Sequence, residues 1–80
     1  MMKIQVYMTD DCPKCEAFGK NLKEAMNELS LDEGIEMLDL KHAIKINVTS
    51  CPAIIINGDI KSMGILLSVE ELKEILKENM

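Results

Sequence analysis

The sequence predicts a single α/β domain whose secondary-structure elements follow the order β-α-β-α-β-β-α. Three observations support this prediction: strand-like apolar runs alternate with helical periodicity, a tight-turn signal separates the last two strand-like runs, and a capping motif opens a helix near the C-terminus. The order implies a four-stranded mixed sheet with helices on both faces. Because 80 residues support only one small core, we expect residues 1–80 to form one domain.

The N-terminal half of the chain carries two strand patterns around one long helix pattern. Residues Ile4–Met8 predict the first strand, and the polar loop Thr9–Asp11 follows it. Pro13 suits the first position of a helix, because its missing N–H group would have no partner there. The helix has one apolar stripe at three- and four-residue steps, formed by Cys15, Phe18, Leu22, Ala25, Met26 and Leu29. After Gly34, residues Ile35–Leu40 predict a short second strand.

The C-terminal half predicts a short helix, a hairpin and a final helix. Residues Lys41–Val48 have weak helical spacing, and the β-branched run Ala53–Ile56 predicts a buried strand. Asn57-Gly58 predicts a tight turn, since both residues tolerate positive φ angles, and Ile60–Met63 forms the return strand. The segment Ser68–Glu71 has the pattern of a capping box and therefore opens the last helix.

Composition and charge exclude several classes of function. The net charge is −5 and the basic residues are scattered singly, so we expect no nucleic-acid partner. The longest apolar runs are far shorter than the ~20 residues of a membrane span, so we expect no membrane attachment. The N-terminus leads straight into a strand pattern, which leaves no room for a signal peptide and predicts a cytoplasmic protein. We assign the seven methionines to the core, with a Met-lined substrate surface as the alternative.

The motif Cys12-Pro13-Lys14-Cys15 lies between the end of a strand and the start of a helix. A helix N-terminus exposes unpaired N–H groups and a partial positive charge, which stabilise a thiolate at Cys12. Cys15 follows one helical turn later, close enough to attack a mixed disulfide formed at Cys12. In a cytosolic chain a disulfide is more often catalytic than structural, and three cysteines fit a structural framework poorly. The motif therefore predicts a thiol–disulfide oxidoreductase.

The residues around the motif are expected to modulate it. Lys14 adds a positive charge that favours the thiolate, whereas Asp10 and Asp11 oppose it, and such exposed pairs contribute too little to reverse the effect of the helix. His42 is expected at the start of the second helix, on the sheet edge that also carries Cys12. We expect it to be solvated, with tuning of the thiolate as the alternative. Tyr7 is expected to pack beneath the motif.

Two other functions fit the same cysteines. Cys12, Cys15 and Cys51 would form the core of a labile metal or iron–sulfur carrier, although their spacing matches no common zinc pattern. A fourth ligand would then come from water, His42, a partner chain or a small thiol. A binding module without redox activity is the remaining alternative. Cys51 itself is either a small buried apolar residue or a third thiol beside the pair.

Several short segments together resemble the small thioredoxin/glutaredoxin-like redox proteins of archaea and bacteria, also called redox-active disulfide proteins. The resemblance spans nearly the whole chain and rests on Met2–Tyr7, Cys12–Cys15, Pro52, Asn57-Gly58, Met63-Gly64 and Glu70–Lys73. It implies a minimal thioredoxin-like fold in which Cys12 is the nucleophile and Cys15 resolves the mixed disulfide. It also implies that Pro52 follows a cis peptide bond and faces Cys12. The substrate would then lie along Ser50, Cys51 and Pro52.

The sequence departs from the two best-known branches of that group. Thioredoxins carry Trp-Cys-Gly-Pro-Cys, and Asp11 takes the place of the Trp here. Glutaredoxins carry Cys-Pro-Tyr-Cys, which is closer, with Lys14 at the Tyr position. The segment Met63–Leu67 lacks the Gly-Gly and Asp of a glutathione site, so glutathione is not the expected donor. The resemblance predicts a monomer that exchanges electrons with protein disulfides and an unidentified reductase, with no cofactor beyond the Cys12–Cys15 disulfide.

Overall fold

The computed structural model describes residues 2–9, 11–32 and 34–80. Within these residues the elements are β1 (Ile4–Tyr7), α1 (Pro13–Glu28), β2 (Ile35–Met37), α2 (Leu40–Lys45), β3 (Ala53–Ile56), β4 (Asp59–Met63) and α3 (Val69–Glu78). The predicted order of strands and helices is therefore confirmed. Asp10, which the sequence places in the loop before the motif, lies outside the described residues.

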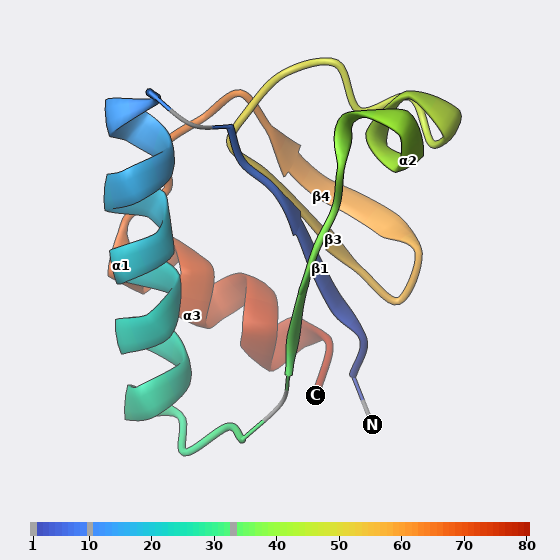
Figure 1. Cartoon of the computed structure of the whole chain (residues 1–80). Coiled ribbons are helices and arrows are strands. Elements are labelled where there is room, and N and C mark those ends of the chain that lie inside the picture. The colour runs from blue at the N-terminus through green and yellow to red at the C-terminus, as the bar shows by residue number, and fades with distance from the viewer. Residues whose placement is uncertain (1, 10, 33) are drawn as a thin grey trace.

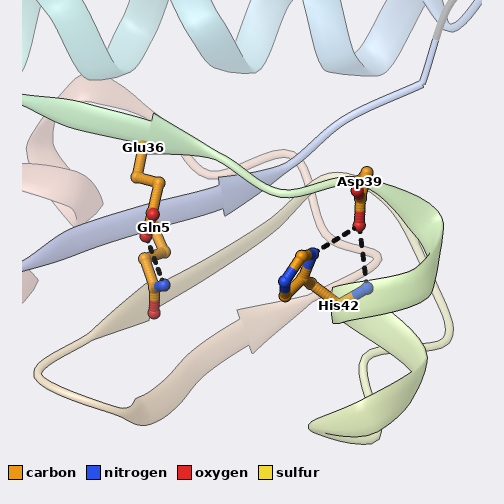
Figure 2. A network of polar contacts seen from close by, with 4 residues as sticks. All are labelled: Gln5, Glu36, Asp39 and His42. Carbon is orange, nitrogen blue, oxygen red and sulfur yellow. Dashed lines mark hydrogen bonds and ion pairs between the residues drawn. The ribbon is translucent and has the colours of Figure 1, made fainter.

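The strands form one mixed sheet in the order β2-β1-β3-β4 (Figure 1). β1 and β2 run parallel, whereas β3 pairs antiparallel with both β1 and β4. Gln5 and Glu36 lie opposite each other on β1 and β2, and the amide of Gln5 donates a 2.5 Å hydrogen bond to the Glu36 carboxylate (Figure 2). The β3–β4 turn falls at Asn57 and Gly58, whose φ angles of 53° and 87° confirm the predicted tight turn.

Helices cover both faces of the sheet, with α1 and α3 on one face and α2 on the other (Figure 1). The alternation of side chains along each strand divides the core between these faces. Ile54 and Ile56 of β3 pack with α1 and α3, while Ala53 and Ile55 belong to the smaller cluster on the opposite face. Tyr7 is buried in that smaller cluster. β3 is thus buried on both faces, as its run of apolar residues predicts.

The boundaries around α2 differ from those expected. β2 ends at Met37, and α2 begins at Leu40 and ends at Lys45, so both elements are shorter than predicted. The cause is Asp39, whose side chain accepts the N–H of His42 at 2.8 Å and caps the helix where the strand was expected to continue. The helix ends ahead of Asn47, which has a φ of 65°, and the chain then turns towards β3.

The last helix follows the predicted pattern closely. Ser68 Oγ accepts the N–H of Glu71 at 3.1 Å, and the Glu71 carboxylate accepts the N–H of Ser68 at 3.0 Å. Leu72 and Leu76 are buried against α1, and Lys73 forms a 3.0 Å ion pair with Glu28 at the far end of α1. The predicted capping box is therefore confirmed. Among the helices described, none has the length and apolar character required to cross a membrane.

Candidate active site

The Cys12–Cys15 motif forms the N-terminus of α1, directly after the loop that leaves β1 (Figure 1). Cys12 is the N-cap residue, with extended backbone angles of φ −120° and ψ 100°, and Pro13 occupies the first helical turn. The Cys12 sulfur accepts a hydrogen bond from the backbone N–H of Cys15 at 3.1 Å. A sulfur therefore occupies the place that a Ser or Asp oxygen usually takes at a helix start.

The two thiols of the motif lie in different environments. Cys12 is partly exposed, whereas Cys15 lies on the buried stripe of α1 with only 3% of its surface exposed. The hydrogen bond from the Cys15 side chain lowers the pKa of Cys12, and the backbone N–H groups of Cys15 and Lys14 act in the same direction. Burial raises the pKa of Cys15 to about 11. The site therefore favours a thiolate at Cys12 and a protonated thiol at Cys15.

The loop before β3 places a third sulfur at the motif. The peptide bond between Cys51 and Pro52 is cis, and Pro52 is fully buried. The sulfurs of Cys12, Cys15 and Cys51 all lie within 4.8 Å of one another. Thr9 Oγ1 lies 3.4 Å from the sulfur of Cys51 and shares a hydrogen bond with it. The structure thus brings Cys51 next to the Cys12–Cys15 pair, from which it is far apart in sequence.

The segment Ser50–Pro52 is held against the end of β4. The carbonyl of Pro52 accepts the N–H of Gly64 at 2.9 Å. Gly64 has a φ of 78°, and a Cβ atom at this position would lie only 3.1 Å from the Cβ of Ser50. A residue with a side chain would therefore be strained in its backbone and crowd the loop. Ser50 itself remains exposed at the surface.

The charged neighbours of the motif contribute less than their sequence positions suggest. Lys14 and Asp11 are both exposed, and Lys14 lowers the pKa of Cys12 through its backbone N–H. His42 is also exposed, and its ring nitrogen Nδ1 lies 2.7 Å from Asp39 Oδ1 (Figure 2). The hydrogen bonds from the backbone and ring of His42 lower the pKa of Asp39. His42 lies outside the group of three sulfurs, and its observed role is at the start of α2.

An open groove of about 650 Å³ lies beside Cys12 and Cys15. It is lined by Met8, Thr9, Asp11, Cys12, Pro13, Cys15, Glu16 and Met37. Met37 is 57% exposed at the end of β2, so methionines contribute to the wall of this groove as well as to the core. Thr9, Glu16 and Met37 were not among the site residues predicted from the sequence. The sequence placed Met37 inside a strand over Ile35–Leu40, whereas β2 ends at Met37, at the edge of the sheet where α/β folds gather ligands.

A partly exposed thiol at a helix start, a buried thiol one turn later and an adjoining open groove define a dithiol–disulfide site. The sequence model of the thioredoxin domain family matches residues 2–77, and the chain belongs to this family. It is 38% identical over 77 residues to a thioredoxin of Methanothermobacter thermautotrophicus, and the aligned region covers 95% of this chain and 99% of the relative. A thioredoxin of Methanocaldococcus jannaschii is 35% identical over 77 residues, covering 96% of this chain and 88% of the relative. These relationships support thiol–disulfide oxidoreductase activity in general terms.

Solved structures support the same fold. The structure of thioredoxin-2, a component of the malaria parasite protein secretion machinery, matches with a TM-score of 0.78 and 16% sequence identity, covering 98% of this chain and 82% of that one. A second malarial protein matches with a TM-score of 0.71 and 19% identity, covering 100% of this chain and 98% of that one. The fold is therefore a minimal thioredoxin-like fold, as the resemblance implied.

Proposed function

We propose that the protein transfers electrons to or from protein disulfides through the Cys12–Cys15 dithiol, as a disulfide reductase with no other cofactor. The observation that carries this proposal is the contrast between the two thiols. The pKa of Cys12 is lowered at a partly exposed helix start, whereas burial raises the pKa of Cys15 to about 11. Such a contrast supports attack by Cys12 and resolution by Cys15, because the thiolate is the reacting form.

Reduction of a substrate proceeds in two exchanges. The Cys12 thiolate attacks one sulfur of the substrate disulfide, and the other substrate sulfur leaves as a thiolate that takes up a proton. Cys15 then loses its proton and attacks the sulfur of Cys12, which releases the second substrate sulfur and forms the Cys12–Cys15 disulfide. Two electrons pass from the protein to the substrate, and a reductase returns them by reducing the disulfide. The reverse sequence oxidises a dithiol substrate.

The substrate is proposed to lie between the segment Ser50–Pro52 and the groove beside Cys12. Cys51 lies next to the reactive sulfur, and the hydrogen bond from Gly64 to Pro52 fixes the segment at the edge of the site. Met8 and Met37 give the groove flexible apolar walls, which suit peptide side chains of varied shape. We therefore favour protein disulfides over glutathione as the exchange partner. Pro13 and Lys14 support the site by forming the first turn of α1.

The setting proposed for this activity is that of a monomer in the cytoplasm. The odd number of cysteines supports a compartment where thiols are kept reduced, since a secreted chain of this size would pair its cysteines. The net charge of −5 supports a partner other than nucleic acid. The family relationship supports protein substrates and a reductase partner in general.

Trapping of a mixed disulfide tests the proposal. A Cys15→Ser variant is mixed with a disulfide-containing protein, and the products are separated without reductant. We expect a covalent adduct that mass spectrometry assigns to Cys12 and that dithiothreitol releases. The matched control, Cys12→Ser in the same Cys15→Ser background, should form no adduct although Cys51 is still present. Adduct formation at Cys51 in the control, or none in the Cys15→Ser variant, would overturn the assignment of Cys12 as nucleophile.

A further inference from the structure

The disulfide chemistry uses two of the three sulfurs at the site and leaves Cys51 without a role. Cys51 belongs to a compact group, because its sulfur lies within 4.8 Å of the sulfurs of both Cys12 and Cys15. Three sulfur ligands bound to one ion lie about 3.8–4.0 Å from each other when each metal–sulfur bond is ~2.3 Å long. The observed group is therefore within about 1 Å of the separation that a shared metal ion requires.

The three sulfurs are carried by two separately anchored segments, the start of α1 and the loop before β3. Cys12 and Cys15 belong to the first turn of α1, where the sulfur of Cys12 is fixed by the N–H of Cys15 at 3.1 Å. Cys51 precedes β3, whose first residue Ala53 pairs with β1 and β4. The hydroxyl of Thr9 lies 3.4 Å from the Cys51 sulfur and shares a hydrogen bond with it. The donor set is thus largely preformed.

We propose that the reduced protein binds one soft metal ion through the sulfurs of Cys12, Cys15 and Cys51. Thiolate ligands select Cu(I) and Zn(II) over hard cations. A three-coordinate Cu(I) ion is satisfied by these three sulfurs, whereas Zn(II) needs a fourth ligand from solvent. Among the residues that the structure describes, no His, Cys, Asp or Glu joins the three as a fourth donor. Each cysteine that is still protonated releases its proton to the solvent on binding, and no electron is transferred.

This site and the disulfide exclude each other, because they use the same atoms. Oxidation of Cys12 and Cys15 removes two of the three donors and leaves Cys51 alone. A bound ion in turn occupies the sulfur of Cys12 and blocks its attack on a substrate. Metal occupancy therefore protects the reduced dithiol from oxidation and holds the protein inactive. The metal site does not depend on the proposed disulfide exchange, and a protein without reductase activity could still contain it.

The test compares the reduced protein with two variants under oxygen-free conditions. Cu(I) and Zn(II) are titrated separately in competition with a chelator of known affinity. Cys51→Ala removes one donor, and Thr49→Ala is the matched control, since it alters an exposed side chain of the same loop but leaves Thr9 and all three sulfurs in place. We expect one ion per chain for the wild type and Thr49→Ala. Cys51→Ala should lower the affinity by at least roughly 100-fold, the upper end of the cost of losing even an outer-shell partner.

X-ray absorption spectroscopy of the Cu(I)-loaded wild type provides a second measurement that needs no variant. We expect three sulfur neighbours around the ion, and no binding after oxidation of the protein to the disulfide form. Two sulfur neighbours, or equal affinity in Cys51→Ala and the wild type, would show that the Cys12–Cys15 pair alone binds metal and would overturn the proposal. One ion per two chains in a dimer would overturn it as well, because the third donor would then come from the partner.

Discussion

The N-termini of α1 and α3 start in the same way and serve different purposes. At each, the side chain of the N-cap residue accepts a backbone N–H from three residues later. In α1 the Cys12 sulfur accepts the N–H of Cys15, and in α3 the Ser68 hydroxyl accepts the N–H of Glu71, both at 3.1 Å. In α3 the Glu71 carboxylate also accepts the N–H of Ser68, so the cap is closed in both directions. In α1 the capping atom is a sulfur that lies beside two further thiols.

The difference shows how one local interaction supplies either stability or reactivity. At α3 the acceptor is a hydroxyl that stays protonated, so the hydrogen bond only stabilises the helix. At α1 the acceptor is a titratable sulfur, whose pKa is lowered by the hydrogen bond from the Cys15 side chain and further by the backbone N–H of Cys15, so the capping hydrogen bond favours the thiolate. An oxygen at position 12 would keep the hydrogen bond and lose the chemistry. This contrast can be tested at both helices.

The largest effect is expected from Cys12→Ser. Serine retains an acceptor for the N–H of Cys15, so the free energy of unfolding should change little. Reduction of protein disulfides should fall to the uncatalysed rate, because the hydroxyl is not a thiolate. Turnover driven by dithiothreitol and urea unfolding of the same preparation check both expectations. A large loss of stability in this variant would contradict the comparison with Ser68, because it would show that serine cannot replace Cys12 as the cap of α1.

The second prediction concerns the rates at which the thiols are alkylated. At pH 8 a thiol with a pKa near 11 has a thiolate fraction of only about 10⁻³, so Cys12 should react more than roughly 100-fold faster than Cys15. The Cys12 rate should reach half of its maximum at a pH below the ordinary thiol pKa of 9.0, since its pKa is lowered. Mass spectrometry of iodoacetamide-treated reduced protein across pH 6–10 measures both rates. Faster labelling of Cys15 would reverse the proposed roles.

The sequence predicted the parts of the fold that depend on neighbouring residues. Pro13 marks the observed start of α1, Ala53–Ile56 are the observed bounds of β3, and the capping box at Ser68 is present. The residues between Met37 and Leu40 were placed wrongly in a strand, because the apolar pattern continues there while the cap at Asp39 already starts α2. The signal for a short helix was in this case one capping side chain rather than a periodic stripe.

The site was predictable to a different extent. The spacing of Cys12 and Cys15 and their place at a helix start follow from local sequence, and the structure gives them unequal burial. The contacts around Cys51 depend on how the loop before β3 crosses the end of β1, which no local pattern specifies. The hydrogen bond between Thr9 and Cys51 joins residues 42 positions apart. Local sequence therefore predicts the Cys12–Cys15 motif, whereas the position of Cys51 beside it depends on long-range packing.

The smallest predicted effect is at the cap of α3. Ser68→Ala removes the acceptor for the N–H of Glu71 and should lower the free energy of unfolding by about 1 kcal/mol. For a domain of this size that corresponds to a fall in Tm of about 4–8 °C. Disulfide reduction at 25 °C should be unchanged, because Ser68 lies outside the groove beside Cys12. Thermal unfolding by circular dichroism and a dithiothreitol-driven turnover assay measure the two quantities.

Ser68→Asp is the matched control for this cap. Aspartate is as good an N-cap acceptor as serine, and its charge is favourable at a helix start, so its Tm should stay close to that of the wild type. Leu67 and Leu72 remain buried on either side in both variants, which restricts the change to the cap itself. A loss of activity in Ser68→Ala with Tm unchanged would contradict the view that the start of α3 supplies only stability while the start of α1 supplies reactivity. It would mean that α3 acts on the thiols through its packing against α1.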